Sequence, residues 1–161
     1  MEVFSSLIWF EPLFKGSKLN KLNRELALEA YQFREMDHQG RRWSKKNYPG
    51  GYTSYGSITN VHQISSTFAE LEKRIRQHVL DYARALHWEV NPDDLRVDSL
   101  WINIMPPQVI HTGHIHPHSA ISGTYYVQIP TGSGPLKFED PRLGFFMARP
   151  TIHPKAPQRF Q

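Results

Sequence analysis

Apolar positions near the start of the chain recur at helical spacing. After the break at Gly16, an apolar side chain returns every three or four residues, which places these side chains on one face of a helix. The pattern predicts an amphipathic helix over residues 17–35, preceded by a short strand over residues 3–10. The apolar positions of the helix are Leu19, Leu22, Leu26, Ala30 and Phe33.

A second amphipathic helix is predicted to begin at Thr67 and to end near His87. Thr67 and Glu70 have the spacing of a capping box, in which the two side chains satisfy backbone groups of the first turn. The apolar residues that follow return on one face, as in a helix that covers a core. They are Phe68, Leu71, Ile75, Val79, Tyr82 and Leu86.

The rest of the chain has the pattern of loops and short strands. Glycines and a proline interrupt residues 37–57, which are therefore predicted to be loop and turn. After a turn at residues 91–94, β-like runs are predicted at residues 95–105, 123–129 and 136–138. Helices followed by strands favour an α+β domain, in which the two helices cover one face of an antiparallel sheet or barrel.

Length and hydropathy indicate one globular domain. A chain of 161 residues can form one domain with a real core but not two large ones. We expect a single domain with a helical part over residues 1–90, a β core over residues 95–142 and a proline-rich tail over residues 143–161. No apolar run reaches the roughly 18 residues of a membrane span, and the N-terminus lacks a signal-peptide pattern, so we expect a cytoplasmic protein without membrane contact.

Cysteine content and charge narrow the candidate chemistry. Cysteine is absent, which excludes disulfides, thiolate nucleophiles and cysteine metal sites, so any metal must be bound by His, Asp or Glu. The net charge of +4 is spread along the chain. Its densest group surrounds Trp43 and is expected to be a solvated loop, so nucleic acid is not expected as a partner. The group consists of Arg41, Arg42, Lys45 and Lys46.

Four of the nine histidines lie within the eight residues from His111 to His118. If this segment is a strand, His114 and His116 project to the same face and can offer two imidazoles to one ion of Fe(II), Mn(II), Zn(II) or Ni(II). Pro117 would end the strand, which places the pair at a strand end that a substrate can reach. We expect His111 and His118 to lie beside the site or in solvent.

The histidine spacing alone leaves two other interpretations open. The histidines could be surface residues of a proline-rich loop, or an adventitious metal site. A cupin metal site also begins with a His-x-His pair, but it continues with a glutamate where this chain has Ser119 to Ser122.

Four short motifs in the second half of the chain form a specific series, and the resemblance that they carry spans about residues 60–142. The series is Leu-Trp-Ile-Asn-Ile-Met-Pro from Leu100, His-Ile-His-Pro from His114, Ser-Gly-Thr-Tyr-Tyr-Val from Ser122, and Gly-Pro-Leu-Lys-Phe-Glu-Asp-Pro-Arg from Gly134. In this order the motifs resemble a family of 2-oxoglutarate/Fe(II) oxygenases found in bacteria and phages.

The resemblance implies a fold, a site and an activity. The implied fold is a double-stranded β-helix, a jelly-roll or cupin-like core that encloses one Fe(II) near its open end. His114 takes the place of the first iron ligand, and His116 stands where the family normally has a carboxylate. This departure leaves the iron site one negative charge short. Asn103 and Tyr126 take the positions of side chains that bind 2-oxoglutarate, and no catalytic residue is implied beyond the metal ligands.

The C-terminal tail departs from the family pattern. Relatives continue with a strand, a distal histidine ligand and an arginine for 2-oxoglutarate. Here His153 and Arg159 lie among prolines, where a barrel strand cannot form. We therefore expect a β core that is incomplete at its C-terminus, in a truncated chain or in a homodimer that covers the open strand edges.

The activity expected from the sequence is that of an Fe(II)/2-oxoglutarate-dependent dioxygenase that hydroxylates a small-molecule or peptidyl substrate. Trp43 and Tyr52 are candidate residues of a lid over this substrate. Two alternatives stay open: a non-catalytic β-fold binding or structural protein that keeps the metal site, and a cupin-like metalloprotein that does not use 2-oxoglutarate.

Overall fold

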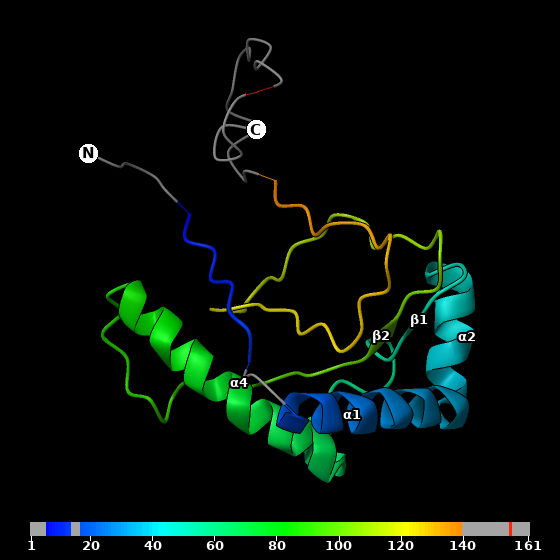
Figure 1. The fold of residues 1–161 in the computed structure, drawn as a ribbon, viewed down its shortest axis with the longest axis horizontal. Coiled ribbons are helices and arrows are strands. Elements are labelled where there is room, and N and C mark those ends of the chain that lie inside the picture. Colours follow the sequence, from blue (N-terminus) through cyan, green and yellow to red (C-terminus); the bar gives the residue numbers. More distant parts are fainter. Residues whose placement is uncertain (1–5, 14–16, 140–154, 156–161) are drawn as a thin grey trace. The chain divides into compact units, whose positions relative to one another are not determined.

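A computed structural model describes residues 6–13, 17–139 and 155 of the protein. The chain divides into two compact units, Met1–Thr131 and Gly132–Gln161. In the second unit, the described residues are exposed and form no helix or strand. The described elements of the first unit are α1 (Ser17–Met36), α2 (His38–Asn47), β1 (Tyr52–Thr53), α3 (Val61–Ile64), α4 (Ser66–Ala85) and β2 (Asn103–Ile104), drawn in Figure 1.

The two predicted helices are confirmed as α1 and α4, but the predicted cap of α4 is wrong. The helix begins one residue earlier than expected, and the Ser65 hydroxyl caps it by accepting a hydrogen bond of 3.1 Å from the Phe68 amide. The Thr67 hydroxyl instead donates to Glu29 of α1, as does the Ser65 hydroxyl. A tertiary contact has therefore replaced the capping box that the spacing of Thr67 and Glu70 predicted.

The prediction of a loop over residues 37–57 is wrong for α2, which occupies residues 38–47. Asp37 begins this helix, because its carboxylate accepts a hydrogen bond of 2.7 Å from the Gly40 amide. Gly40 does not break the helix. It lies so close to the Asp37 side chain that an added Cβ would be 1.9 Å from the carboxylate oxygen Oδ2.

The strand predictions are confirmed only over a short part of residues 95–105. β1 and β2 pair antiparallel, with Tyr52 opposite Ile104. The pairing continues beyond the strands, since the Ser54 amide donates to the Ile102 carbonyl at 2.9 Å and the Ile102 amide donates to the Ser54 hydroxyl at 3.0 Å. The buried Ser44 hydroxyl of α2 then bonds both backbone groups of Thr53, which fixes α2 against β1.

The other predicted strands do not form among the described residues. Residues 6–10, 123–129 and 136–138 form no strand and take part in no ladder with another described segment. Mixed helices and a small sheet are compatible with an α+β fold, but the part of the chain that the structure describes does not contain a double-stranded β-helix.

The hydrophobic core lies where α1 and α4 meet the two strands. The apolar faces predicted for the helices reach the core over residues 22–33 of α1 and over residues 68–75, the first half of α4. The Phe33 and Phe68 rings pack edge to face with 5.9 Å between centroids. Figure 1 shows α1 lying across α4, with α2 at the C-terminal end of α1. The buried core residues are Leu22, Leu26, Tyr52, Val61, Phe68, Leu71 and Ile102.

The segment around Tyr125 has the alternating burial of a strand, although it forms no strand ladder. Tyr125 and Val127 pack against the core, whereas Tyr126 is exposed. The Tyr125 hydroxyl donates to Asn23 of α1 at 2.6 Å, and burial raises its pKa. Of the two neighbouring tyrosines, Tyr125 is therefore the one that points to the core. In the described part of the chain, no helix has the length and apolar character to cross a bilayer.

Candidate metal centre

The His114 and His116 side chains meet through their Nε2 atoms, which are 3.0 Å apart. The other ring nitrogen of His114, Nδ1, lies 2.9 Å from the Thr112 carbonyl oxygen. A carbonyl oxygen can only accept, so Nδ1 of His114 carries a hydrogen, and in the neutral ring the Nε2 lone pair is then available. His116 must then supply the proton between the two Nε2 atoms.

This separation suits two neighbouring ligands of one metal ion. Nitrogens bound to an ion at about 2.1 Å lie about 3.0 Å apart when the angle between them is about 90°. The pair therefore fits a six-coordinate divalent ion as two of its ligands. Within the described residues, no group of three or more His, Asp or Glu side chains could hold a metal. His153 and Arg159 of the C-terminal tail lie outside the described residues.

His111 contacts the pair but is engaged elsewhere. Its ring centroid is 4.5 Å from that of His114, and its Nδ1 is 2.6 Å from the Tyr48 hydroxyl. The same hydroxyl donates to the Met105 sulfur at 3.0 Å. Burial lowers the pKa of His111, with further lowering by His114 and His116, while burial raises the pKa of Tyr48 to about 12. Both side chains are therefore neutral near pH 7.

Trp101 lies on the other side of the pair. Its ring centroid is 5.9 Å from that of His116, with 30° between the ring planes. Tyr55 meets Trp101 edge to face at 5.2 Å. The histidine pair is therefore flanked by His111 and Tyr48 on one side and by Trp101 and Tyr55 on the other.

Strand alternation explains how β2 supports this cluster. Ile102 is buried in the core and Ile104 packs against it, so Trp101, Asn103 and Met105 project from the opposite face. Trp101 contacts His116 and Met105 contacts Tyr48, so this face of β2 carries the histidine cluster. Asn103, predicted to bind the cosubstrate, shares this face and is exposed.

The histidine segment is not the strand that the sequence analysis assumed. Residues 111–116 form no ladder, and the pair is brought together by a loop that closes on the Thr112 carbonyl. Residues 117 and 118 form a turn in which His118 has a φ of +69°. His118 is exposed, as expected.

The structure separates the other predicted site residues. Tyr126 is 45% exposed, and within the described chain no hydrogen bond or ring contact joins it to the histidines. Tyr52 is only 4% exposed and donates to Asp37 at 2.9 Å, so this candidate lid residue belongs to the core. Trp43 is 37% exposed on α2, and its ring lies against Gly56.

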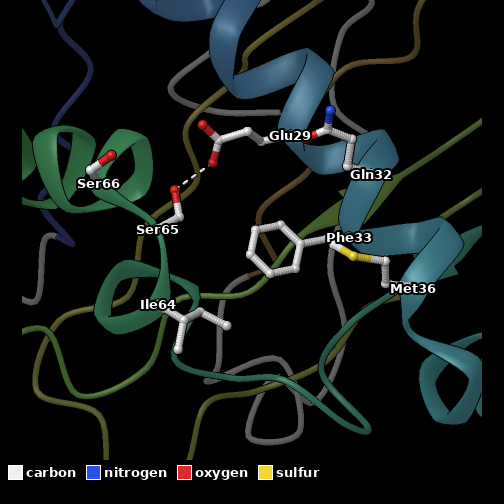
Figure 2. Close-up of a pocket in the computed structure, with 7 residues that line it drawn as sticks. All are labelled: Glu29, Gln32, Phe33, Met36, Ile64, Ser65 and Ser66. Carbon is white, nitrogen blue, oxygen red and sulfur yellow. Dashed lines mark hydrogen bonds between the residues drawn. The ribbon is translucent and has the colours of Figure 1, made fainter.

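A pocket of about 320 Å³ lies between α1 and the start of α4, and none of the clustered histidines lines it (Figure 2). Its polar end is the hydrogen bond of 2.5 Å from Ser65 to Glu29. The lining residues are Glu29, Gln32, Phe33, Met36, Ile64, Ser65 and Ser66.

Trp101 and Met105 were missed by the sequence analysis. The signal that could have found them is their period of two with Asn103, which places all three on one face of the predicted strand. Tyr48 gave no such signal, because its contact with His111 joins residues 63 positions apart.

Comparison with known proteins concerns the C-terminal part of the chain. No curated protein matches the chain. The model of one family, described as "Putative 2OG-Fe(II) oxygenase", matches residues 99–161. The match begins later than the predicted start near residue 60 and continues through the proline-rich tail. Residues 99–161, which contain β2 and the histidine pair, are thus similar to a 2-oxoglutarate/Fe(II) oxygenase family.

Proposed function

We propose that the protein is an Fe(II)/2-oxoglutarate-dependent dioxygenase in which His114 and His116 are two of the iron ligands. The observation that carries the proposal is the convergence of two Nε2 atoms at 3.0 Å, within a region that matches an oxygenase family. When bound, Fe(II) with O2 and 2-oxoglutarate would supply the oxidising chemistry that hydroxylates a substrate.

The side chains around the pair orient it. The Thr112 carbonyl fixes the ring of His114 through Nδ1, which keeps the Nε2 lone pair directed at the site. The Trp101 ring beside His116 and the His111 ring beside His114 limit how far either imidazole can turn. The protein therefore holds both rings in place before any ion arrives, although His116 must move its proton from Nε2 to Nδ1 to become a ligand.

The family resemblance supports the remaining parts of the proposal. Asn103 and Tyr126 would bind 2-oxoglutarate, and Asn103 lies on the face of β2 that carries Trp101. The double-stranded β-helix is the family fold that we propose for the C-terminal region. The substrate would be a small molecule or a group on a larger chain.

Anaerobic titration tests this function. The protein is titrated with Fe(II) and then with 2-oxoglutarate while the weak visible charge-transfer band of the ternary complex is followed. We expect the band with the wild-type chain and its loss with His114→Ala. His118→Ala is the matched control, because this exposed histidine lies on the same segment and should leave the band unchanged.

A second candidate is a metal-binding protein that does not use 2-oxoglutarate. The ligands favour this second candidate. Two imidazoles carry no negative charge, so they neutralise less of the charge of Fe(II) than a ligand set that includes a carboxylate. The same titration separates the candidates. Fe(II) binding that depends on His114 but gives no band would support the second candidate, and the absence of metal binding would contradict both.

A further inference from the structure

Helix α2 presents a face that carries only positive charge. Its sequence contains no Asp or Glu. Gly40 and Ser44 are buried, and at about 100° per residue they define the side of α2 that faces the protein. Arg42, Lys45 and Lys46 project from the opposite side and are exposed. The loop expected from the sequence is thus a helix that arranges three cations on one surface.

These three cations are not neutralised within the part of the chain that the structure describes. The neighbouring Arg41 pairs with Glu35 at 3.2 Å, whereas Arg42, Lys45 and Lys46 take part in none of the described ion pairs. Lys45 and Lys46 suit the C-terminal end of a helix, but Arg42 lies near its middle. Helix stability therefore does not account for the whole group.

Aromatic rings continue from this basic face toward the histidine pair. On α2, Trp43 lies between Lys46 and the buried side, and its ring rests on Gly56. Tyr55, which precedes Gly56 in the chain, is 57% exposed, and its ring meets that of Trp101. Trp101 in turn lies beside His116. We name Trp43, Tyr55 and Trp101 the aromatic path.

We propose that the basic face of α2 and the aromatic path form a binding surface for single-stranded nucleic acid. Phosphates would contact the cations, and unpaired bases would stack on the exposed rings, as on other surfaces that bind single strands. An acidic peptide would match the charge but not the rings, and a duplex keeps the faces of its bases covered. A bound base would be presented to the metal at His116 only if the proposed function holds. The binding of the single strand to this surface does not depend on that function.

The charge contribution is measured by fluorescence anisotropy with a labelled oligothymidylate of about 16 nucleotides and metal-free protein. We expect binding that weakens with salt. The combined variant Arg42→Ala, Lys45→Ala and Lys46→Ala should lower the slope of log K against log salt by about 2, since each phosphate contact with a single strand contributes about 0.7. The matched control removes three exposed cations elsewhere, at Lys21, Arg24 and Lys73.

The ring contribution is measured at Tyr55, which is exposed enough to change without unfolding the chain. Tyr55→Ala should weaken binding roughly tenfold, and Tyr55→Phe, which keeps the ring, should bind like the wild type. An oligouridylate of the same length distinguishes RNA from DNA, and a preference for either supports the surface.

Three outcomes would overturn the proposal: equal losses in the two triple variants, unchanged binding by Tyr55→Ala, or equal affinity for a duplex. The last two would indicate a general polyanion surface. All measurements are made without iron or 2-oxoglutarate. A failed iron titration and a failed nucleic-acid titration are therefore separate results.

Discussion

His114 shows how one backbone contact can prepare a side chain for metal binding. The Thr112 carbonyl accepts a hydrogen bond from Nδ1–H of His114, so the neutral ring accepts a hydrogen bond at Nε2 from His116. An imidazole free in solution exchanges between two tautomers, but this arrangement selects one for each ring. The selection needs no charged neighbour.

We predict opposite tautomers for the two histidines in the metal-free protein. Nitrogen NMR at neutral or higher pH should show His114 protonated at Nδ1 and His116 protonated at Nε2. The exposed His118 is the internal control and should show the mixture of free histidine. Addition of Zn(II) as a diamagnetic probe should move the His116 proton to Nδ1. Protonation of His114 at Nε2 in the free protein would contradict the proposed geometry.

Helix α2 lacks the signal by which α1 and α4 were predicted. The apolar residues of α1 and α4 repeat at helical spacing, whereas the ten residues of α2 contain one large apolar side chain, Trp43. What holds α2 is polar: the cap by Asp37 and the bonds from Ser44 to Thr53. Such contacts depend on residues that the rest of the fold brings near, and a local pattern cannot reveal them.

His114 and His116 were expected to lie side by side on a strand, and the structure brings them together in a loop. The period-two argument assumed a strand, but a loop closes the pair. The flanking side chains were harder to predict, because Tyr48 and Trp101 reach the histidines from segments that are distant in sequence. The predicted strands beyond residue 105 failed because an alternating pattern describes which side chains face a core and does not supply a pairing partner.

We predict that Gly40→Ala destabilises the protein, although the same change stabilises most helices. An alanine normally gains about 1 kcal/mol over glycine inside a helix. Here its Cβ would lie 1.9 Å from the Asp37 carboxylate and 2.5 Å from the Ser57 hydroxyl. The free energy of unfolding in urea should fall by at least about 1 kcal/mol. Gly123→Ala is the control, because nothing lies within 4 Å of the added Cβ. Equal stability of the two variants would mean that Asp37 can move aside.

At the scale of the whole molecule, one buried polar group joins elements that are separate in sequence. Asp37 follows α1, begins α2, and accepts hydrogen bonds from Tyr52 in β1 and from Ser57 beyond it. Burial and the bond to Asp37 raise the pKa of Tyr52 above its ordinary value of 10.0. The global stability of the fold is thereby linked to the protonation of this tyrosine.

We predict that the free energy of unfolding decreases at alkaline pH through Tyr52. The raised pKa means that the folded state holds the proton more tightly than the unfolded state. The stabilisation is therefore complete below about pH 10 and is lost as pH rises through the pKa of the folded protein. Urea unfolding from about pH 8 to about pH 11 should show a steeper decline for the wild type than for Tyr52→Phe. Parallel curves would contradict the linkage.

The Ser65 hydroxyl makes two bonds at once at the edge of the pocket in Figure 2. It accepts from the Phe68 amide, which starts α4, and it donates to Glu29, which lies 36 residues earlier in α1. An oxygen that gives its proton to a carboxylate becomes a better acceptor, so each bond strengthens the other. We therefore expect the first turn of α4 and the docking of α1 against it to form together during folding.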